Sequence, residues 1–221
     1  MDQLIAQFFN LDIMAKALPT ILRGLGMTLL ICCAVIPLGL AGGLGAALAT
    51  TARSRWLRWP AMALVDLFRA IPPLVLLIFV YAGLPFAGIR LSPFVAVALA
   101  FLLNNSAYYG EVFRAGLISV GTGQWEAARS TGLTQRQTLS HVILPQATRN
   151  VLPDLISNTV EVVKLTSLAS VVSLGELLHA AGLARSVTYN ASPLTLAAAI
   201  YLVLLWPVVR LLSRYQRRLV A

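Results

Sequence analysis

Long apolar runs alternate with short polar stretches along the 221 residues of this chain. A helix needs about 20 mostly apolar residues to cross the hydrocarbon core of a bilayer. Five runs meet that length, so we expect membrane spans at about 22–50, 60–84, 93–117, 152–172 and 194–212. Residues 1–20 mix apolar and polar side chains, which is typical of a helix at the membrane surface. The pattern predicts an all-α integral membrane protein in which 1–221 form one transmembrane domain.

The longest polar interval is the loop at 119–145. Within it, Gly132 can adopt a positive φ, which suits the end of a helix. Thr134, with Gln137 three residues later, predicts a capping box at the start of another helix. Pro145 fits the first turn of the helix that follows, where its missing N–H is not needed. The loop is therefore expected to form two short helices in water, joined by a sharp turn.

The first two spans carry packing and bending signals. Small residues recur every four positions in the first span, at Gly39, Gly43 and Ala47. Another helix can pack closely on that face. Pro72 and Pro73 interrupt the second span and free backbone carbonyls, which is tolerated only against protein or a water-lined cavity. Asp66 and Arg69 are three residues apart and can pair on one helix face.

Polar side chains in the middle of the third and fourth spans are a further feature. The third span continues through Asn104, Asn105, Ser106, Tyr108, Tyr109 and Glu111, and the fourth contains Asn158, Glu161 and Lys164. Such groups are costly in hydrocarbon, so they should face a bundle interior or a cavity. Glu161 and Lys164 are three residues apart and can also pair with each other.

Composition supports the membrane assignment and sets the orientation. The chain is 58% hydrophobic and 11% charged, with a net charge of +9, whereas a soluble domain has about 25% charged residues. Eleven arginines lie within 53–58, 114–149 and 210–218, against four basic residues on the other side of the five spans. The positive-inside rule places the 119–145 loop in the cytoplasm and the N-terminus outside. The positive charge therefore reports topology, and nucleic-acid binding is not expected.

Enzyme chemistry finds little support in the residues. Cys32 and Cys33 are adjacent in an apolar run and are expected to be reduced packing residues, with no metal site. His141 and His179 fall on opposite sides of the predicted membrane and cannot share a site. The sequence also has no G-x-x-x-x-G-K-[ST] phosphate loop, so any ATP hydrolysis would belong to a partner.

The polar loop resembles the EAA loop of ABC-importer permeases. The matching residues are Glu126, Ala127, Ala128, Gly132, Leu144 and Pro145, and Val142 stands where the family usually has Ile. The resemblance implies a type I permease fold (MetI-like) with five transmembrane helices. It also implies that these six residues form the coupling helix that docks on the ATPase subunit. Ala127 and Ala128 are expected to leave a bare surface that another protein could approach closely.

The rest of the chain is similar to the polar amino-acid branch of these permeases. The similarity lies in 24–29, 68–74, 106–114, 123–126 and 164–168. It implies import of a polar amino acid across the cell inner membrane, delivered by an extracytoplasmic binding protein. ATP and Mg would bind to the partner ATPase, and no cofactor is expected in this chain. Many relatives have a polar or acidic residue where Leu165 stands, so substrate specificity is not carried over residue by residue.

The same resemblance implies alternating access in a dimer, because five helices cannot easily enclose a pathway. The second subunit would be another copy or a paralogue. Candidate residues of the substrate pathway are Asn105, Tyr108, Glu111, Glu161 and Lys164. The charged ones suit the ammonium and carboxylate of an amino acid, and the alternative is that they form structural ion pairs.

Three alternatives remain open at this point. The cargo could be an opine, an osmolyte or another amine-containing solute. An ATP-independent secondary carrier or a channel would explain the spans and buried charges, but it would not explain the EAA loop. A membrane-embedded enzyme would need a nucleophile or a metal set, which the residues do not suggest.

Overall fold

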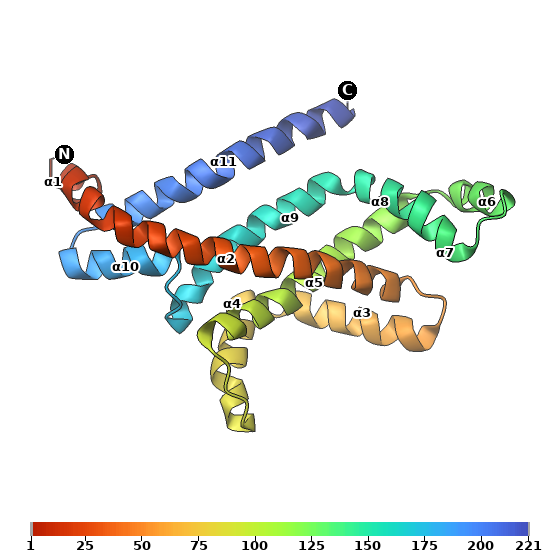
Figure 1. Cartoon of the computed structure of the whole chain (residues 1–221), viewed down its shortest axis with the longest axis horizontal. Coiled ribbons are helices and arrows are strands. Elements are labelled where there is room, and N and C mark those ends of the chain that lie inside the picture. Colours follow the sequence, from red (N-terminus) through yellow and green to blue (C-terminus); the bar gives the residue numbers. More distant parts are fainter. Residues whose placement is uncertain (1, 221) are drawn as a thin grey trace. The chain divides into compact units, whose positions relative to one another are not determined.

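The computed structural model describes residues 2–220, with side chains for residues 3–214, and contains helices and short connections but no strand in that range. The long helices are α2 (Leu11–Thr50), α3 (Arg55–Ala70), α5 (Pro93–Ser119), α9 (Leu152–Leu165) and α11 (Ser192–Val220). Shorter elements are α1 (Asp2–Phe8), α4 (Pro73–Ile78), η1 (Phe79–Gly83), η2 (Leu84–Ala87), α6 (Thr122–Ser130), α7 (Gln135–Gln137), η3 (Thr138–Ile143), α8 (Leu144–Asn150), η4 (Thr166–Val172) and α10 (Leu177–Thr188). Figure 1 shows their order along the chain. The all-α prediction is confirmed.

Three described stretches are long and apolar enough to cross a membrane: Gln3–Thr50, Leu152–Val172 and Ser192–Arg214. A fourth candidate is Arg55–Ala70 together with Pro73–Ala87, if the pair is counted as one broken span. The 27-residue helix α5 is not among these candidates, since its second half carries the polar residues noted above. The number of five crossings therefore stays a prediction.

The described residues divide into two compact units. The first contains Met1–Val35, Pro73–Phe101 and Val160–Ala221. Its core is a cluster of Ala17, Ile21, Leu177, Ala181 and Ala197. In Figure 1, α10 runs beside the N-terminal part of α2. The two helices are in close contact: a Cβ on Gly24 would lie only 2.8 Å from the Cβ of Ala180. The N–H of Leu177 also donates to the hydroxyl of Thr28 at 3.1 Å.

The N-terminal segment is attached to the connection between α10 and α11. The N–H of Ala191 donates to the carbonyl of Gln7 at 2.9 Å, and the N–H of Asn10 donates to the hydroxyl of Ser192 at 2.9 Å. That residues 1–20 lie at the membrane surface stays a prediction. The helix is broken within this stretch, since α1 ends at Phe8 and α2 begins at Leu11, and these contacts lie at the break.

The second unit contains Ile36–Pro72 and Leu102–Thr159. The small-residue face of α2 packs there against α5, as predicted. A Cβ on Gly43 would lie 2.4 Å from the Cβ of Tyr109, and one on Gly39 would lie 3.3 Å from the ring of the same tyrosine. Gly116 brings α5 equally close to α8, since its Cβ would lie 2.7 Å from the carbonyl oxygen of Ala147. The C-terminal half of α5 is thereby fixed on two sides.

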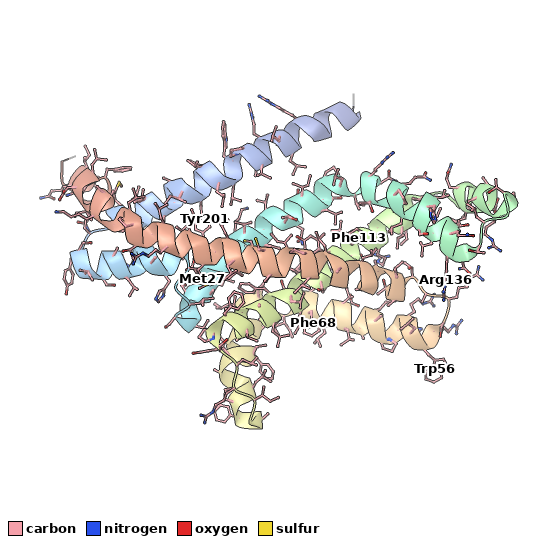
Figure 2. The ribbon with its side chains drawn as sticks, in the orientation of Figure 1. Met27, Trp56, Phe68, Phe113, Arg136 and Tyr201 are labelled. Carbon is pink, nitrogen blue, oxygen red and sulfur yellow. The ribbon has the colours of Figure 1, made fainter. Side chains whose placement is uncertain are left out.

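The second predicted span begins earlier than expected and is interrupted at the two prolines, as predicted. Helix α3 already begins at Arg55, with Pro60 inside it, and the helix stops at Ala70 before the two prolines. Figure 2 shows Trp56 projecting from the first turn of α3, and 93% of this residue's surface is exposed. Such exposure suits an aromatic anchor at the membrane interface. Arg217 and Arg218, which the charge count included, lie outside the residues whose side chains the structure describes.

Candidate functional site

The polar loop folds as predicted into a helix, a turn and a second helix. Helix α6 ends at Ser130, and Gly132 has a φ of +87° in the turn. Thr134 then starts the next helix with a complete capping box. Its N–H donates to Oε1 of Gln137 at 2.9 Å, and the N–H of Gln137 donates to the Thr134 hydroxyl at 3.4 Å. Figure 1 shows α6 and α7 folded back on each other at this turn.

Side-chain bonds across the turn hold the hairpin together. The guanidinium of Arg129 donates to the carbonyl of Leu133 at 3.0 Å. The hydroxyl of Thr131 donates to the carbonyl of Ala128 at 2.8 Å. The first bond satisfies a carbonyl in the turn itself, and the second satisfies one in the last turn of α6, where the helix supplies no partner. The hairpin therefore has a defined conformation without any contact from another protein.

Glu126 lies on the exposed surface of α6, beside a groove with a cavity volume of about 480 Å³. The groove is lined by Thr51, Arg53, Trp125, Glu126, Arg129 and Gln135. One carboxylate and two guanidinium groups thus share a water-exposed hollow next to the turn. Figure 2 places Arg136 on the neighbouring helix α7.

The other residues of the EAA pattern are divided between surface and interior. Ala127 is exposed, whereas Ala128 is buried with 7% of its surface exposed, so only one of the two alanines contributes to the bare surface expected there. Leu144 and Pro145 form the first turn of α8, which confirms the position predicted for Pro145. The helical turn before them is a π-helix, η3, which the sequence analysis did not predict.

A charge cluster surrounds Glu111 on α5. Its carboxylate accepts two hydrogen bonds from Arg114 on the next turn, one of them at 3.0 Å from Nε. The guanidinium of Arg69, at the end of α3, lies 3.6 Å from the same carboxylate. These three side chains are 30% to 37% exposed. Among the ion pairs of the described residues, Arg69 is joined to Glu111, and the predicted pairing with Asp66 is not found.

Asn105 and Tyr108, the other two candidates on α5, have different surroundings. Asn105 is 1% exposed and faces α2, where its Cβ would be 3.6 Å from a Cβ on Gly39. Tyr108 is 38% exposed, and its ring centre lies 5.7 Å from the guanidinium carbon of Arg69. Sequence reasoning missed Arg69 as a member of this cluster, because helical spacing suggested Asp66 as its partner.

Glu161 and Lys164 on α9 form the ion pair that their spacing allows. The ammonium of Lys164 lies 2.6 Å from the carboxylate of Glu161, and the two side chains are 53% and 60% exposed. Lys164 also borders a cavity of about 460 Å³ between α9 and α11, lined mostly by apolar residues such as Leu205 and Trp206. Charge pairs this exposed contribute little to stability.

The remaining candidates for chemistry are the cysteines and histidines. Both cysteines are free thiols, with Cys32 buried and Cys33 exposed. Within the described part of the chain, no group of three or more His, Cys, Asp and Glu side chains is placed to hold a metal ion.

Comparison with known proteins adds a family. Residues 39–221 match the family described as binding-protein-dependent transport system inner membrane component. The probable amino-acid ABC transporter permease protein YckA of Bacillus subtilis is 39% identical over 171 residues, covering 77% of this chain and 76% of the relative. The arginine transport system permease protein ArtQ of the same organism is 34% identical over 199 residues, covering 88% and 91%.

Solved structures agree with these relatives. A crystal structure of an amino acid ABC transporter with histidines is 35% identical, with a TM-score of 0.84 over 93% of this chain and 96% of the other. The MetNI methionine ABC transporter in an inward-facing conformation shows the same fold, with a TM-score of 0.76 at 21% identity over 90% and 95% of the two chains. The folded polar loop, the all-helical architecture and these matches lead to one conclusion: the chain belongs to the inner-membrane component family of binding-protein-dependent transport systems, the permeases of ABC importers.

Proposed function

We propose that this chain is the permease subunit of an ATP-driven importer that carries a polar amino acid into the cell. The observation that carries the proposal is the loop at 122–143. It is a capped helix–turn–helix that presents Glu126 to water beside two arginines, at the residues that match the EAA pattern. A hairpin fixed by its own hydrogen bonds can transmit a displacement as a rigid lever.

The loop docks on an ATPase subunit, which binds ATP and Mg. Closure of the ATPase pair on ATP pushes the hairpins of the two permease subunits, and the pathway changes from facing inward to facing outward. An extracytoplasmic binding protein then delivers the substrate. The positive-inside rule supports an orientation with the N-terminus outside and the loop and C-terminus in the cytoplasm.

The substrate pathway lies at the interface with a second permease subunit, either another copy or a paralogue. Tyr108 and Glu111 on α5, with Glu161 and Lys164 on α9, are the residues proposed to line it. Asn105, the other candidate from the sequence, is buried against α2. The exposure of the Glu161–Lys164 pair in the single chain supports this role. When the substrate arrives, the carboxylate of Glu161 can bind its ammonium group and the ammonium of Lys164 can bind its carboxylate.

The class of cargo is supported by the relatives. Several carry names of amino-acid, arginine, glutamine or cystine transport systems. An opine or an osmolyte has the same amine chemistry and would enter by the same pathway.

The test uses the permease reconstituted in liposomes with its ATPase and binding protein. Uptake of labelled arginine, histidine, glutamine and glutamate is followed with and without ATP. We expect uptake of at least one of them, only when ATP is present on the side of the ATPase. Uptake that persists at a fixed membrane potential without ATP contradicts the importer and favours a secondary carrier. ATP hydrolysis without uptake of any of the four amino acids contradicts the proposed cargo.

A further inference from the structure

The two prolines after α3 leave two specific carbonyl groups without helical partners. In an α-helix, the carbonyl of residue i accepts the N–H of residue i+4. The carbonyl of Leu67 accepts such a hydrogen bond from the N–H of Ile71, at 3.1 Å. The next two carbonyls, of Phe68 and Arg69, would need the N–H of positions 72 and 73, and both are prolines. An unpaired carbonyl is costly at a membrane position.

Helix α5 supplies two donors at these carbonyls. The amide Nδ2 of Asn104 donates to the carbonyl of Phe68 at 2.9 Å. The hydroxyl of Tyr108 donates to the carbonyl of Arg69 at 3.4 Å. Asn104 and Tyr108 are four residues apart, on one face of α5, so successive turns of this helix reach successive carbonyls of the other. Each donor replaces one N–H group that a proline lacks.

The same face of α5 also holds the side chain of Arg69. Glu111, one turn beyond Tyr108, lies 3.6 Å from its guanidinium, and the ring of Tyr108 faces that group at 5.7 Å. Two backbone carbonyls and one side chain at the end of α3 are thus bound by three residues of α5.

The environment of Asn104 indicates that this position needs an amide side chain in order to donate to the carbonyl of Phe68. The side chain is 1% exposed, and among the described residues its Oδ1 has no hydrogen-bond partner. Burying an amide that satisfies only part of its bonding capacity costs free energy, and a leucine of similar size would avoid this cost. The donor group is therefore the part of the side chain that the fold uses.

We propose that Asn104 and Tyr108 are positioning residues that stand in for the two N–H groups missing at Pro72 and Pro73. They join the C-terminal end of α3 to α5 as one body. The functional part of this inference rests on the proposed function: α5 ends at Ser119, three residues before α6, so the joint carries a displacement of the loop to the break at Ile71–Pro72.

Hydrogen exchange tests the joint without reference to transport. In the reconstituted transporter, exchange of the amides at 69–71 is compared between wild type, Asn104→Leu and Tyr108→Phe. Side-chain hydrogen bonds in membrane proteins contribute modestly, so we expect each variant to raise the exchange rate roughly threefold. The control is Tyr189→Phe, which removes a hydroxyl from a residue 89% exposed and should leave these rates unchanged. Wild-type rates in both joint variants would overturn the proposal.

A compensating change separates this role from general destabilisation. Proline disfavours the α conformation at the residue before it, and Ile71 is indeed extended, with φ −81° and ψ 126°. Pro72→Ala releases Ile71 and provides an N–H for the carbonyl of Phe68. Asn104→Leu should then raise exchange much less in the Pro72→Ala background than in wild type. Equal effects in the two backgrounds would contradict the idea that the Asn104 amide replaces the N–H missing at position 72.

The consequence for coupling is measured as substrate molecules taken up per ATP hydrolysed. We expect this ratio to fall in Asn104→Leu, while ATP hydrolysis continues and Tyr189→Phe keeps the wild-type ratio. If wild type takes up substrate with ATP and Asn104→Leu keeps its ratio, the joint does not carry the displacement, although the proposed function stands. If wild type shows no ATP-dependent uptake, the proposed function fails, and the exchange data still decide whether the joint exists.

Discussion

Two glycines of α2 show how strongly single positions are constrained. A Cβ on Gly43 would lie 2.4 Å from the Cβ of Tyr109 and 2.9 Å from the backbone nitrogen of Gly110. A Cβ on Gly45, half a turn away, would have no neighbour within 4 Å. The first contact joins two rigid backbones and cannot relax by rotation of a side chain, whereas the second position is open.

Gly43→Ala is therefore expected to destabilise the protein, while Gly45→Ala is tolerated. Overpacking of a close contact costs about 1–3 kcal/mol, and the cost here should be at the upper end because backbone atoms are involved. The thermal unfolding of both variants in detergent gives the comparison. Equal unfolding temperatures for the two variants would show that α2 and α5 do not pack at Gly43.

Glu176 is the buried carboxylate of the described residues, with 0% exposure in the connection before α10. Its oxygens accept the N–H of Leu178 at 2.8 Å and of His179 at 2.6 Å, and the hydroxyl of Tyr201 lies 3.4 Å away. Burial raises the pKa of this carboxyl, and the backbone hydrogen bonds oppose the rise without cancelling it. The folded protein thus binds the proton more tightly than the unfolded chain.

A raised pKa in the folded state means that stability is lost as pH rises. The contribution of Glu176 is fully present below the unfolded pKa of about 4.3 and disappears as pH rises through the higher folded value. Glu176→Gln removes this dependence, so its unfolding temperature should vary less with pH over that window. An unchanged slope in Glu176→Gln would contradict the effect of burial on the pKa.

At the scale of elements, proline determines more than helix ends. The π-helical turns η1 and η3 each come directly before a Leu–Pro pair. In each, the leucine N–H bonds five residues back, Leu84 to Phe79 and Leu144 to Leu139. The following proline offers no N–H to the carbonyl four residues before it, so the hydrogen-bond ladder widens by one residue there. Composition and periodicity do not reveal this shift.

The turn of the loop depends on Gly132. Gly132 has a φ of +87° and open space around it, so backbone strain alone limits its replacement. Gly132→Val should cost about 1–2 kcal/mol, because a β-branched residue is poorly accommodated there, and should lower uptake per ATP hydrolysed. Gly132→Asn tolerates positive φ better and should stay close to wild type. Full coupling in the valine variant would count against the hairpin as a rigid lever.

The elements of the loop were predictable because their signals are local. The positive φ of Gly132, the capping box of Thr134 and the place of Pro145 each depend on residues within one turn. The Arg69–Glu111 pair and the bond from Asn104 to Phe68 were not predictable, since they join residues 42 and 36 positions apart. The sequence instead suggested Asp66 for Arg69, because helical spacing detects only partners on the same helix.

In the molecule as a whole, apolar helices make up most of the chain, and many of the polar side chains either hold helices together or form the loop. The apolar runs cross or enter the membrane, and α5 holds the broken end of α3. The loop that follows α5 is the longest polar segment and folds on its own hydrogen bonds. Family membership and these contacts support the central proposal that the loop transmits ATP hydrolysis in a partner to a transport pathway in this chain.

The most direct test of that claim is ATP-dependent uptake by Glu126→Ala in liposomes, measured together with ATP hydrolysis. Asp154→Ala, which also removes an exposed carboxylate from a helix outside the loop, is the matched control. We expect Glu126→Ala to lose uptake, to hydrolyse ATP without regard to the loaded binding protein, and to remain in the membrane in normal amount. Wild-type uptake per ATP in Glu126→Ala would contradict the account.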